Sequence, residues 1–348
     1  MQNYKTACVV TTIQLPTACL VSFTKRLAGF QIPMLAIGDE TSPPGFSLSG
    51  CTFVSLSDQQ RMDFTLSKLL PVRHYSRKNL GYLIAMMSGA ECIYETDDDN
   101  RPNDTWTPRN ATVSAWRANP AEWVNVYRYF TEEVIWPRGY PLNSIRDSLE
   151  GEVILQGLAE PADAPIQQGL ADGSPDVDAI WRLLFDRQIE FNGRRSIFVP
   201  QSCWCPFNSQ STWWWPPTYP LLYLPSFCSF RATDIWRSFI AQRCLWEMGH
   251  ELVFHPPEVL QERNFHDLTK DFEAEIAVYT QGNKLARRLA DVKLNAGKGS
   301  ALDNLVRCYE ALSGEFFPEK ELALVRAWAD DIRNIGQHTS PAGEFPAL

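Results

Sequence analysis

Apolar runs and helical patterns alternate through the first hundred residues, and this alternation limits the folds that the chain can adopt. Runs typical of short buried strands lie at residues 7–12, 34–37, 51–56 and 91–96. A helical pattern separates the last two runs. Strands that alternate with helices predict βαβ units, and therefore an α/β fold with a mainly parallel sheet flanked by helices.

The helical pattern before the fourth run indicates where one helix begins and ends. Its apolar positions follow the i, i+3, i+4, i+7 spacing of a buried helix face, and they are Leu80, Leu83, Ile84 and Met87. Ser76 is the expected N-cap, and Gly89 is the expected end. The chain therefore enters the fourth strand directly from a helix.

Three consecutive aspartates, Asp97, Asp98 and Asp99, follow the fourth strand. Ligands of parallel sheets bind beyond the carboxyl ends of the strands, where these side chains should lie. A divalent cation would relieve their mutual repulsion, and oxygen ligands suit Mg²⁺ or Mn²⁺. Since Mg²⁺ is commonly held by one or two carboxylates and substrate phosphates, the cluster predicts a nucleotide-diphosphate site. The alternatives are a solvated acidic loop or a helix N-terminus that attracts aspartates.

A second Asp-x-Asp pattern occurs at Asp176-Val-Asp178. It lies in a loop that leads into an expected helix at 179–184, and aspartate is a favoured N-cap. We therefore interpret this second pattern mainly as a helix cap rather than a metal site.

Cations near the acidic strand are candidate phosphate ligands. Lys78 and Asn79 open the helix before that strand, where a cation, an amide and the helix N-terminus can meet a diphosphate. Arg138 lies in a turn between proline and glycine, and its planar fork suits phosphate oxygens. The alternative for Arg138 is an ion pair with a structural carboxylate.

Charge, cysteine content and the length of the apolar runs argue against several classes of protein. A net charge of -9 argues against broad nucleic-acid binding. The nine cysteines show no zinc spacing and are expected to be reduced thiols of a cytoplasmic protein. Gln14 and Pro16 interrupt the apolar segment near the N-terminus, which argues against a signal peptide. No run approaches the length of a membrane helix, so no integral membrane segment is expected.

In the remainder of the chain, the amino-acid composition and pattern change twice. Residues 101–230 are rich in Pro, Gly, Trp and Tyr and predict irregular structure with short strands packed on the sheet. Trp213-Trp214-Trp215 within this stretch is either an acceptor platform or a buried plug. Beyond residue 267 four helices are expected, near 267–281, 284–295, 300–313 and 318–335.

A series of short motifs carries the most specific signal. In chain order they are His74-Tyr-Ser-Arg-Lys-Asn-Leu-Gly-Tyr-Leu83, Gly89-Ala90, Thr96-Asp-Asp-Asp-Asn100, Trp136-Pro-Arg-Gly-Tyr-Pro-Leu142, Pro175-Asp-Val-Asp-Ala-Ile-Trp-Arg-Leu183, Pro206-Phe-Asn-Ser-Gln210, Thr233-Asp-Ile-Trp-Arg237, Ala241-Gln-Arg-Cys-Leu-Trp246 and Gln261-Glu-Arg-Asn-Phe-His266. The set resembles the STELLO-type glycosyltransferase-like proteins and, more distantly, the reversibly glycosylated polypeptides, which are UDP-arabinopyranose mutases. This resemblance spans about residues 7–280, so the C-terminal helices are expected to lie outside it.

The resemblance implies a GT-A-like fold and roles for particular residues. In GT-A enzymes the first strand and its loop hold the nucleoside, which implies contacts from Thr11 and Thr12. Asp39, after the second strand, is the expected uracil or ribose contact. Its alternative is to shape a Gly-Asp turn.

Two further roles concern catalysis and the metal. Asp234 is the expected catalytic base for the acceptor hydroxyl, unless it caps the following helix. His266 would complete a metal shell with Asp97 and Asp99, unless it forms a cap pair with Asp267.

The resemblance therefore implies a glycosyltransferase that depends on Mn²⁺ or Mg²⁺. It would move a hexosyl or pentosyl group from a UDP-linked nucleotide-sugar donor to a carbohydrate or glycoconjugate acceptor. Residues 1–265 would form the nucleotide-sugar-binding and catalytic domain, 266–336 a C-terminal helical segment, and 337–348 a loose tail. The alternatives are a nucleotide-sugar mutase and a catalytically idle GT-A scaffold that acts as an assembly subunit.

Overall fold

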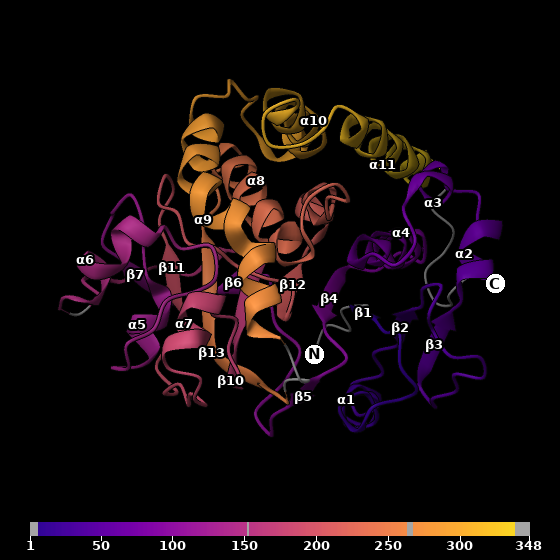
Figure 1. Cartoon of the computed structure of the whole chain (residues 1–348), viewed down its shortest axis with the longest axis horizontal. Helices are drawn as coiled ribbons and strands as arrows, with labels where there is room; N and C mark the ends of the chain where they lie inside the picture. The colour runs from indigo at the N-terminus through magenta and orange to yellow at the C-terminus, as the bar shows by residue number, and fades with distance from the viewer. Residues whose placement is uncertain (1–5, 152, 263–266, 338–348) are drawn as a thin grey trace.

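A long mixed sheet forms the centre of the computed structural model, which describes residues 6–151, 153–262 and 267–337 (Figure 1). The strands are β1 Thr6–Thr11, β2 Met34–Ile37, β3 Cys51–Val54, β4 Cys92–Thr96, β5 Asn100–Pro102, β6 Thr112–Val113, β7 Trp116–Ala118, β8 Leu155–Leu158, β9 Ala162–Asp163, β10 Ile166–Gly173, β11 Ile197–Val199, β12 Ser211–Trp214 and β13 Leu252–Gln261. Their order in the large sheet is β3-β2-β1-β4-β12-β10-β13-β11-β7-β8, with β5 paired to β13. Strands β6 and β9 form a separate pair.

The N-terminal part of the sheet is entirely parallel. Strand β1 pairs in parallel with β2 and β4, and β2 pairs in parallel with β3. Every residue of β2 and β4 is buried, because helices cover both faces of this part of the sheet. The α/β class with helices flanking the sheet is therefore confirmed.

The tryptophan run contributes to strand β12, which joins the two halves of the sheet. Strand β12 lies antiparallel to both β4 and β10. The side chains of Trp213 and Trp214 are fully buried, and their indole nitrogens donate to Glu258 and Glu95. Trp215 is also buried. The run is thus a buried plug, and the acceptor-platform interpretation was wrong.

Helices lie on both faces of the sheet. They are α1 Ala18–Ala28, α2 Leu56–Arg61, α3 Thr65–Leu69, α4 Lys78–Met87, α5 Val126–Phe130, α6 Ile145–Leu149, α7 Ala179–Leu184, α8 Thr233–Glu247, α9 Leu268–Ala290, α10 Ala301–Leu312 and α11 Lys320–Gln337, with 3-10 turns η1 Tyr75–Arg77, η2 Leu142–Ser144, η3 Pro216–Leu222, η4 Phe230–Ala232 and η5 Lys298–Ser300. Helix α4 packs on β1 and β2. A Cβ atom at Gly81 would lie 2.5 Å from Val9 Cγ1, so glycine permits this close approach.

The start of α4 differs from the sequence prediction. A 3-10 turn, η1, precedes it, and His74 caps that turn by accepting from the Ser76 backbone amide at Nδ1. Arg77 rather than Ser76 stands at the N-cap position of α4, without a side-chain cap. The Ser76 hydroxyl instead contacts Ser226. Gly89 follows the end of the helix with φ +74°, as its expected stop requires.

The C-terminal helices pack on the sheet domain rather than apart from it. Helix α9 merges the first two expected helices, whereas α10 and α11 match the other two. Helix α11 packs against α3 and α4, and its Trp328 is fully buried. Carboxylate oxygens of Asp331 accept from the backbone amides of Thr65 and Leu66, each at 2.9 Å. In the described part of the chain, no helix has both the length and the apolar character to cross a membrane.

We expect Asp331→Ala to destabilise the protein by about 1–3 kcal/mol, because it leaves two backbone donors of α3 without an acceptor. The matched control is Asp330→Ala, whose exposed carboxylate pairs with Arg333 at 3.0 Å. It should change stability by less than about 0.5 kcal/mol. Thermal or denaturant unfolding of the two variants measures the difference. Equal losses would show that Asp331 does not couple α11 to the N-terminal half.

Candidate active site

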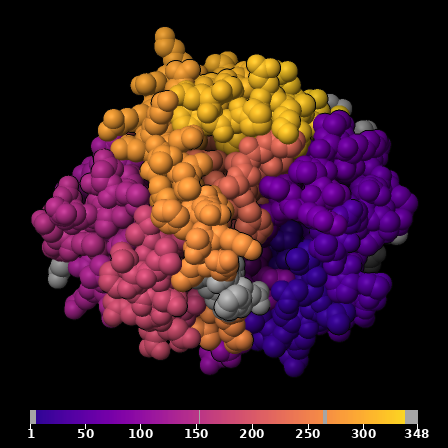
Figure 2. Space-filling model, in the orientation of Figure 1, coloured from indigo at the N-terminus to yellow at the C-terminus, as the bar shows by residue number. Residues whose placement is uncertain are grey.

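A cavity of about 530 Å³ opens at the carboxyl end of the parallel strands. Residues of β1, β2, the segment after β4 and the turn before α4 line one side. Residues around Arg138, 175–177, 208–210 and η4 line the other. Figure 2 shows the surface hollowed between the indigo N-terminal region and the orange region of α9. The cavity thus joins sequence segments separated by more than a hundred residues.

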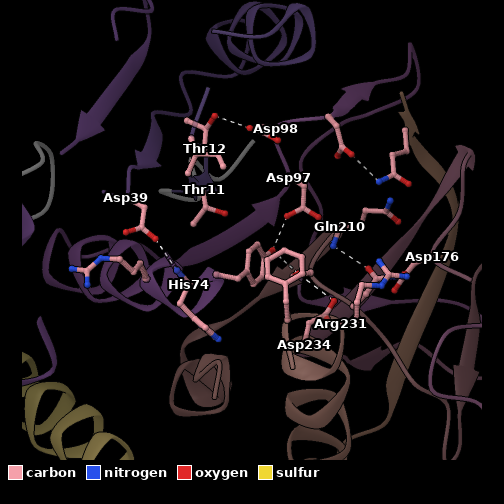
Figure 3. Close-up of a pocket in the computed structure, with 18 of the residues that line it drawn as sticks. Thr11, Thr12, Asp39, His74, Asp97, Asp98, Asp176, Gln210, Arg231 and Asp234 are labelled. Atoms are coloured by element: carbon pink, nitrogen blue, oxygen red, sulfur yellow. Dashed lines mark hydrogen bonds between the residues drawn. The ribbon is translucent and has the colours of Figure 1, made fainter. Parts of the chain in front are cut away.

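The three aspartates of the acidic cluster contact different partners, and Figure 3 shows two of them, Asp97 and Asp98. Asp98 accepts a hydrogen bond from the Thr12 hydroxyl at 2.6 Å. Asp97 accepts from the Tyr75 hydroxyl at 2.6 Å and from Lys78 Nζ at 3.1 Å. Asp99 Oδ2 accepts from the Gln261 amide at 3.0 Å. All three carboxylates line the cavity.

One oxygen of the cluster is buried without a partner among the described residues. Asp99 Oδ1 makes no hydrogen bond within residues 6–151, 153–262 and 267–337. Burial, followed by the charge of Asp97, raises the pKa of Asp99 to about 7. Burial also raises the pKa values of Asp97 and Asp98. A cation beside these carboxylates would satisfy the free oxygen and offset their repulsion, so the residues present fit a divalent metal.

Protein side chains alone do not form a complete metal shell here. Within residues 6–151, 153–262 and 267–337, no group of three or more His, Cys, Asp or Glu residues is arranged to hold a metal ion. His266, the expected third ligand, lies outside the described residues. A metal at this site would therefore depend on carboxylates and on oxygens of the ligand itself, as Mg²⁺ commonly does.

The expected nucleoside contacts lie together at one end of the cavity. Thr11, Thr12 and Asp39 all line it, next to His74 (Figure 3). Asp39 accepts from the His74 backbone amide at 2.8 Å and from the Glu40 amide at 2.7 Å. Asp39 therefore shapes the turn, as its alternative role requires, and also faces the cavity.

Lys78 and Asn79 lie behind the cavity wall. Lys78 is fully buried, and its ammonium donates to the Tyr75 hydroxyl, the Thr96 carbonyl and Asp97. The Asn79 side chain exchanges two hydrogen bonds with the backbone of Leu224. Neither lines the cavity, so the structure does not agree with direct contacts to a diphosphate. Lys78 positions a carboxylate, and Asn79 fixes a loop.

Arg138 joins two carboxylates at the opposite end of the cavity. Its guanidinium donates to both oxygens of Asp176, at 2.7 and 2.9 Å, and to both oxygens of Asp234, at 3.1 and 3.0 Å. Burial alone would raise the pKa of Asp234, but the charge and hydrogen bonds of Arg138 lower it below its ordinary value. The ion-pair alternative for Arg138 is thus realised, in a residue that still faces the cavity.

Asp178 and Asp234 were both candidate helix caps, and the structure shows a cap at Asp178 but not at Asp234. Asp178 caps α7 by accepting from the Trp181 amide at 2.8 Å, as the sequence predicts. Helix α8 instead has Ala232 at its N-cap position, without a side-chain cap. Asp234 lies inside the first turn and is directed to Arg138.

Several cavity residues were missed by the sequence reasoning. They are Tyr75, Asp176, Ser209, Gln210, Phe230 and Arg231. Most of them lie inside the motifs quoted above, so the motif set already contained a signal. It could not show which side chain of each motif faces the cavity.

Comparison with known proteins relates the chain to one group of glycosyltransferases. The family model described as "STELLO glycosyltransferases" matches residues 231–342. Two Arabidopsis thaliana proteins, "Probable glycosyltransferase STELLO1" and "Probable glycosyltransferase STELLO2", are 28% and 27% identical to the chain over 350 residues. The chain is STELLO-like.

The matched regions define what this likeness covers. Each alignment includes 94% of the STELLO-like chain but only 44% of the relative, so the chain spans less than half the length of these relatives. The family model includes the C-terminal helices, so the expectation that these helices lie outside the resemblance was wrong. The likeness supports a GT-A-like fold and a glycosyltransferase family for the STELLO-like chain.

The raised pKa of Asp99 predicts a pH-dependent effect of Asp99→Asn in chelator. The folded-state pKa of about 7 lies above the ordinary value of 3.8, so the unfolded chain loses this proton first as the pH rises. The stability contribution of Asp99 therefore falls between about pH 4 and about pH 7. Asp99→Asn should raise stability at pH 8, on the order of 1 kcal/mol or more, and change little at pH 4.

Thermal unfolding at both pH values measures this effect. Asp63→Asn, at an exposed position, is the control and should show no pH-dependent gain. A loss of stability at pH 8 in Asp99→Asn would contradict the proposed cost of burying this charge.

Proposed function

We propose that the chain is a metal-dependent glycosyltransferase that uses a UDP-linked sugar as donor. The observation that carries the proposal is the buried oxygen of Asp99, which has no hydrogen-bond partner in the described part of the chain and lies in a cavity shared with Thr12, Asp39 and Asp234. Together these residues provide a position for a cation at Asp99, a position for the nucleoside at Thr12 and Asp39, and a carboxylate for the acceptor at Asp234. The likeness to probable glycosyltransferases supports the same chemistry.

Asp97 and Asp99 would hold the metal, which would be Mn²⁺ or Mg²⁺, and Asp98 would contact the donor beside them. When bound, the metal supplies positive charge for the diphosphate leaving group. Tyr75 and Lys78 hold Asp97 from one side, whereas Gln261 holds Asp99 from the other. These contacts fix the carboxylates before any ligand arrives, which reduces the reorganisation that donor binding requires.

The nucleoside would bind at the end formed by Thr11, Thr12 and Asp39. The Thr12 hydroxyl links this end to the acidic cluster through Asp98. The hydrogen bonds of Asp39 to two backbone amides hold its carboxylate at the cavity wall. Ribose hydroxyls or a uracil N–H are suitable donors to this carboxylate.

Asp234 would accept the proton of the acceptor hydroxyl, and Arg138 would position it. The ion pair keeps Asp234 ionised at neutral pH, so it is ready to accept a proton. The same pair lowers its basicity, which reduces the driving force for proton transfer. This weaker basicity favours one second candidate, a scaffold that binds the donor without transfer.

We expect Mn²⁺ or Mg²⁺ to raise the affinity for UDP at least about tenfold, or about 1.4 kcal/mol, over chelator. Asp99→Ala should remove most of this gain because it deletes the unpartnered oxygen. Calorimetric titration of UDP with each metal and with chelator measures both effects. Asp104→Ala, an exposed aspartate on the next loop, is the control and should keep the gain. Equal UDP affinity with metal and with chelator would contradict the proposed metal site.

Asp234→Asn should slow sugar transfer by about a hundredfold or more while donor binding stays near normal, because it removes the proton acceptor. Single-turnover transfer to an acceptor, or to water, measures the rate. The matched control is Asp176→Asn, which disturbs the same guanidinium of Arg138 but leaves Asp234 in place.

This control separates two roles. If Asp234 is the base, Asp176→Asn retains much more activity than Asp234→Asn. Equal losses in both variants would assign the effect to Arg138 instead. A donor that binds normally but never turns over in the wild type would support the scaffold.

A further inference from the structure

An exposed phenylalanine lines the proposed active site. Phe230 has 59% of its surface exposed, and it borders the same cavity as Asp97 and Asp234. A large aromatic ring left in water forfeits the free energy of its burial, about 25 cal/mol per Å² of apolar surface. The exposed ring therefore provides a surface that a ligand can cover.

The ring of Phe230 lies beside the acidic cluster. It packs edge-on against Tyr75, with ring centroids 5.6 Å apart and an interplanar angle of 75°. The hydroxyl of Tyr75 in turn donates to Asp97. A group that covers Phe230 would thus lie next to the carboxylates that are proposed to hold the metal and the diphosphate.

The backbone around Phe230 is fixed by neighbouring contacts. The Ala232 amide donates to the Ser229 carbonyl at 2.9 Å and closes turn η4. The Arg231 carbonyl accepts from Arg138, and the Arg231 guanidinium pairs with Glu275 at 2.7 Å. The turn is held on both sides of Phe230, so the ring is presented from an ordered segment.

Polar groups line the same cavity as the ring. Asp176, Gln210 and Arg231 offer hydrogen-bond acceptors and donors there (Figure 3). An apolar face in a cavity that also holds carboxylate, amide and guanidinium groups matches a pyranose ring, which has a C–H face and a rim of hydroxyls.

We propose that Phe230 is the platform on which a pyranosyl ring stacks in this cavity. The proposal rests on the proposed function and adds a specificity-determining residue to it. It assigns this task to Phe230 instead of the Trp213–Trp215 run, which the sequence left open as a platform and which is buried. The ring belongs either to the donor sugar or to the acceptor, and both present the same C–H face.

The test compares four variants by calorimetry in Mn²⁺. The probes are UDP, UDP-glucose and a glucose tetrasaccharide. Phe230→Ala should leave the affinity for UDP unchanged and weaken one of the two sugar ligands about tenfold. Phe230→Trp should restore binding, whereas Phe230→Leu, which keeps apolar bulk without a ring, should not. Phe185→Ala removes a part-exposed phenylalanine outside the cavity and should behave as the wild type.

The two sugar probes distinguish the source of the ring. Loss of the UDP-glucose advantage over UDP supports stacking of the donor sugar, and loss of tetrasaccharide affinity supports stacking of the acceptor. An upfield shift of the sugar C–H protons in NMR spectra, present in wild type and absent in Phe230→Ala, would support stacking directly.

The inference is overturned if Phe230→Ala binds both sugar probes as the wild type does. It is also overturned if wild type gains nothing from either sugar, or if Phe230→Leu keeps full affinity. Failure of the proposed function has a different signature, which is a wild type that does not bind UDP in the presence of metal. The tetrasaccharide titration still decides the role of Phe230 in that case.

Discussion

The placement of negative charge at the end of β4 is the constraint on which the site depends. Three adjacent carboxylates sit where the sheet is covered by helices, and each is partly removed from water. Lys78 compensates Asp97 from a fully buried position, and Thr12 and Gln261 supply neutral donors to Asp98 and Asp99. Removing one partner of such a buried ion pair commonly costs about 3–5 kcal/mol, so the cluster and its supports act as one unit.

The second half of the chain completes the site from the opposite side. Strand β12 pairs with β4 and brings Ser209 and Gln210 beside the acidic cluster. Helix α8 brings Asp234, and the turn at Arg138 links it to Asp176. The guanidinium between two carboxylates keeps this wall ordered and holds Asp234 in its ionised form at the cavity. The wall therefore combines structural and chemical roles in the same residues.

The family likeness and the geometry constrain the function at different levels. The likeness supports a glycosyltransferase family, but it covers less than half of the compared relatives. The geometry supplies what the likeness does not, which is a set of residues with definite partners. Lys78 illustrates the difference. It lies in one of the motifs that carry the resemblance, yet its partners show that it supports Asp97 rather than a ligand.

Much of the fold and part of the site could be predicted from the sequence, because they depend on local patterns. Hydrophobic periodicity located β1, β2, β4 and α4, and the acidic cluster appeared at the end of β4 as expected. The helix cap at Asp178 could also be predicted, because its partner, the Trp181 amide, is close in the sequence. Periodicity could not show that the first two C-terminal helices are one helix, or that a 3-10 turn capped by His74 precedes α4, since both depend on neighbouring elements.

The sequence by itself determined the α/β class, the parallel strands and the position of the three aspartates. Only the tertiary structure decided which polar side chains face the cavity. Asn79 and Asp39 are both polar residues next to a strand or helix end, but one fixes Leu224 and the other faces the cavity. Likewise, Trp213 is buried whereas Phe230 is exposed. The reason is physical: the partner of each side chain comes from a distant segment, and no local pattern specifies that contact.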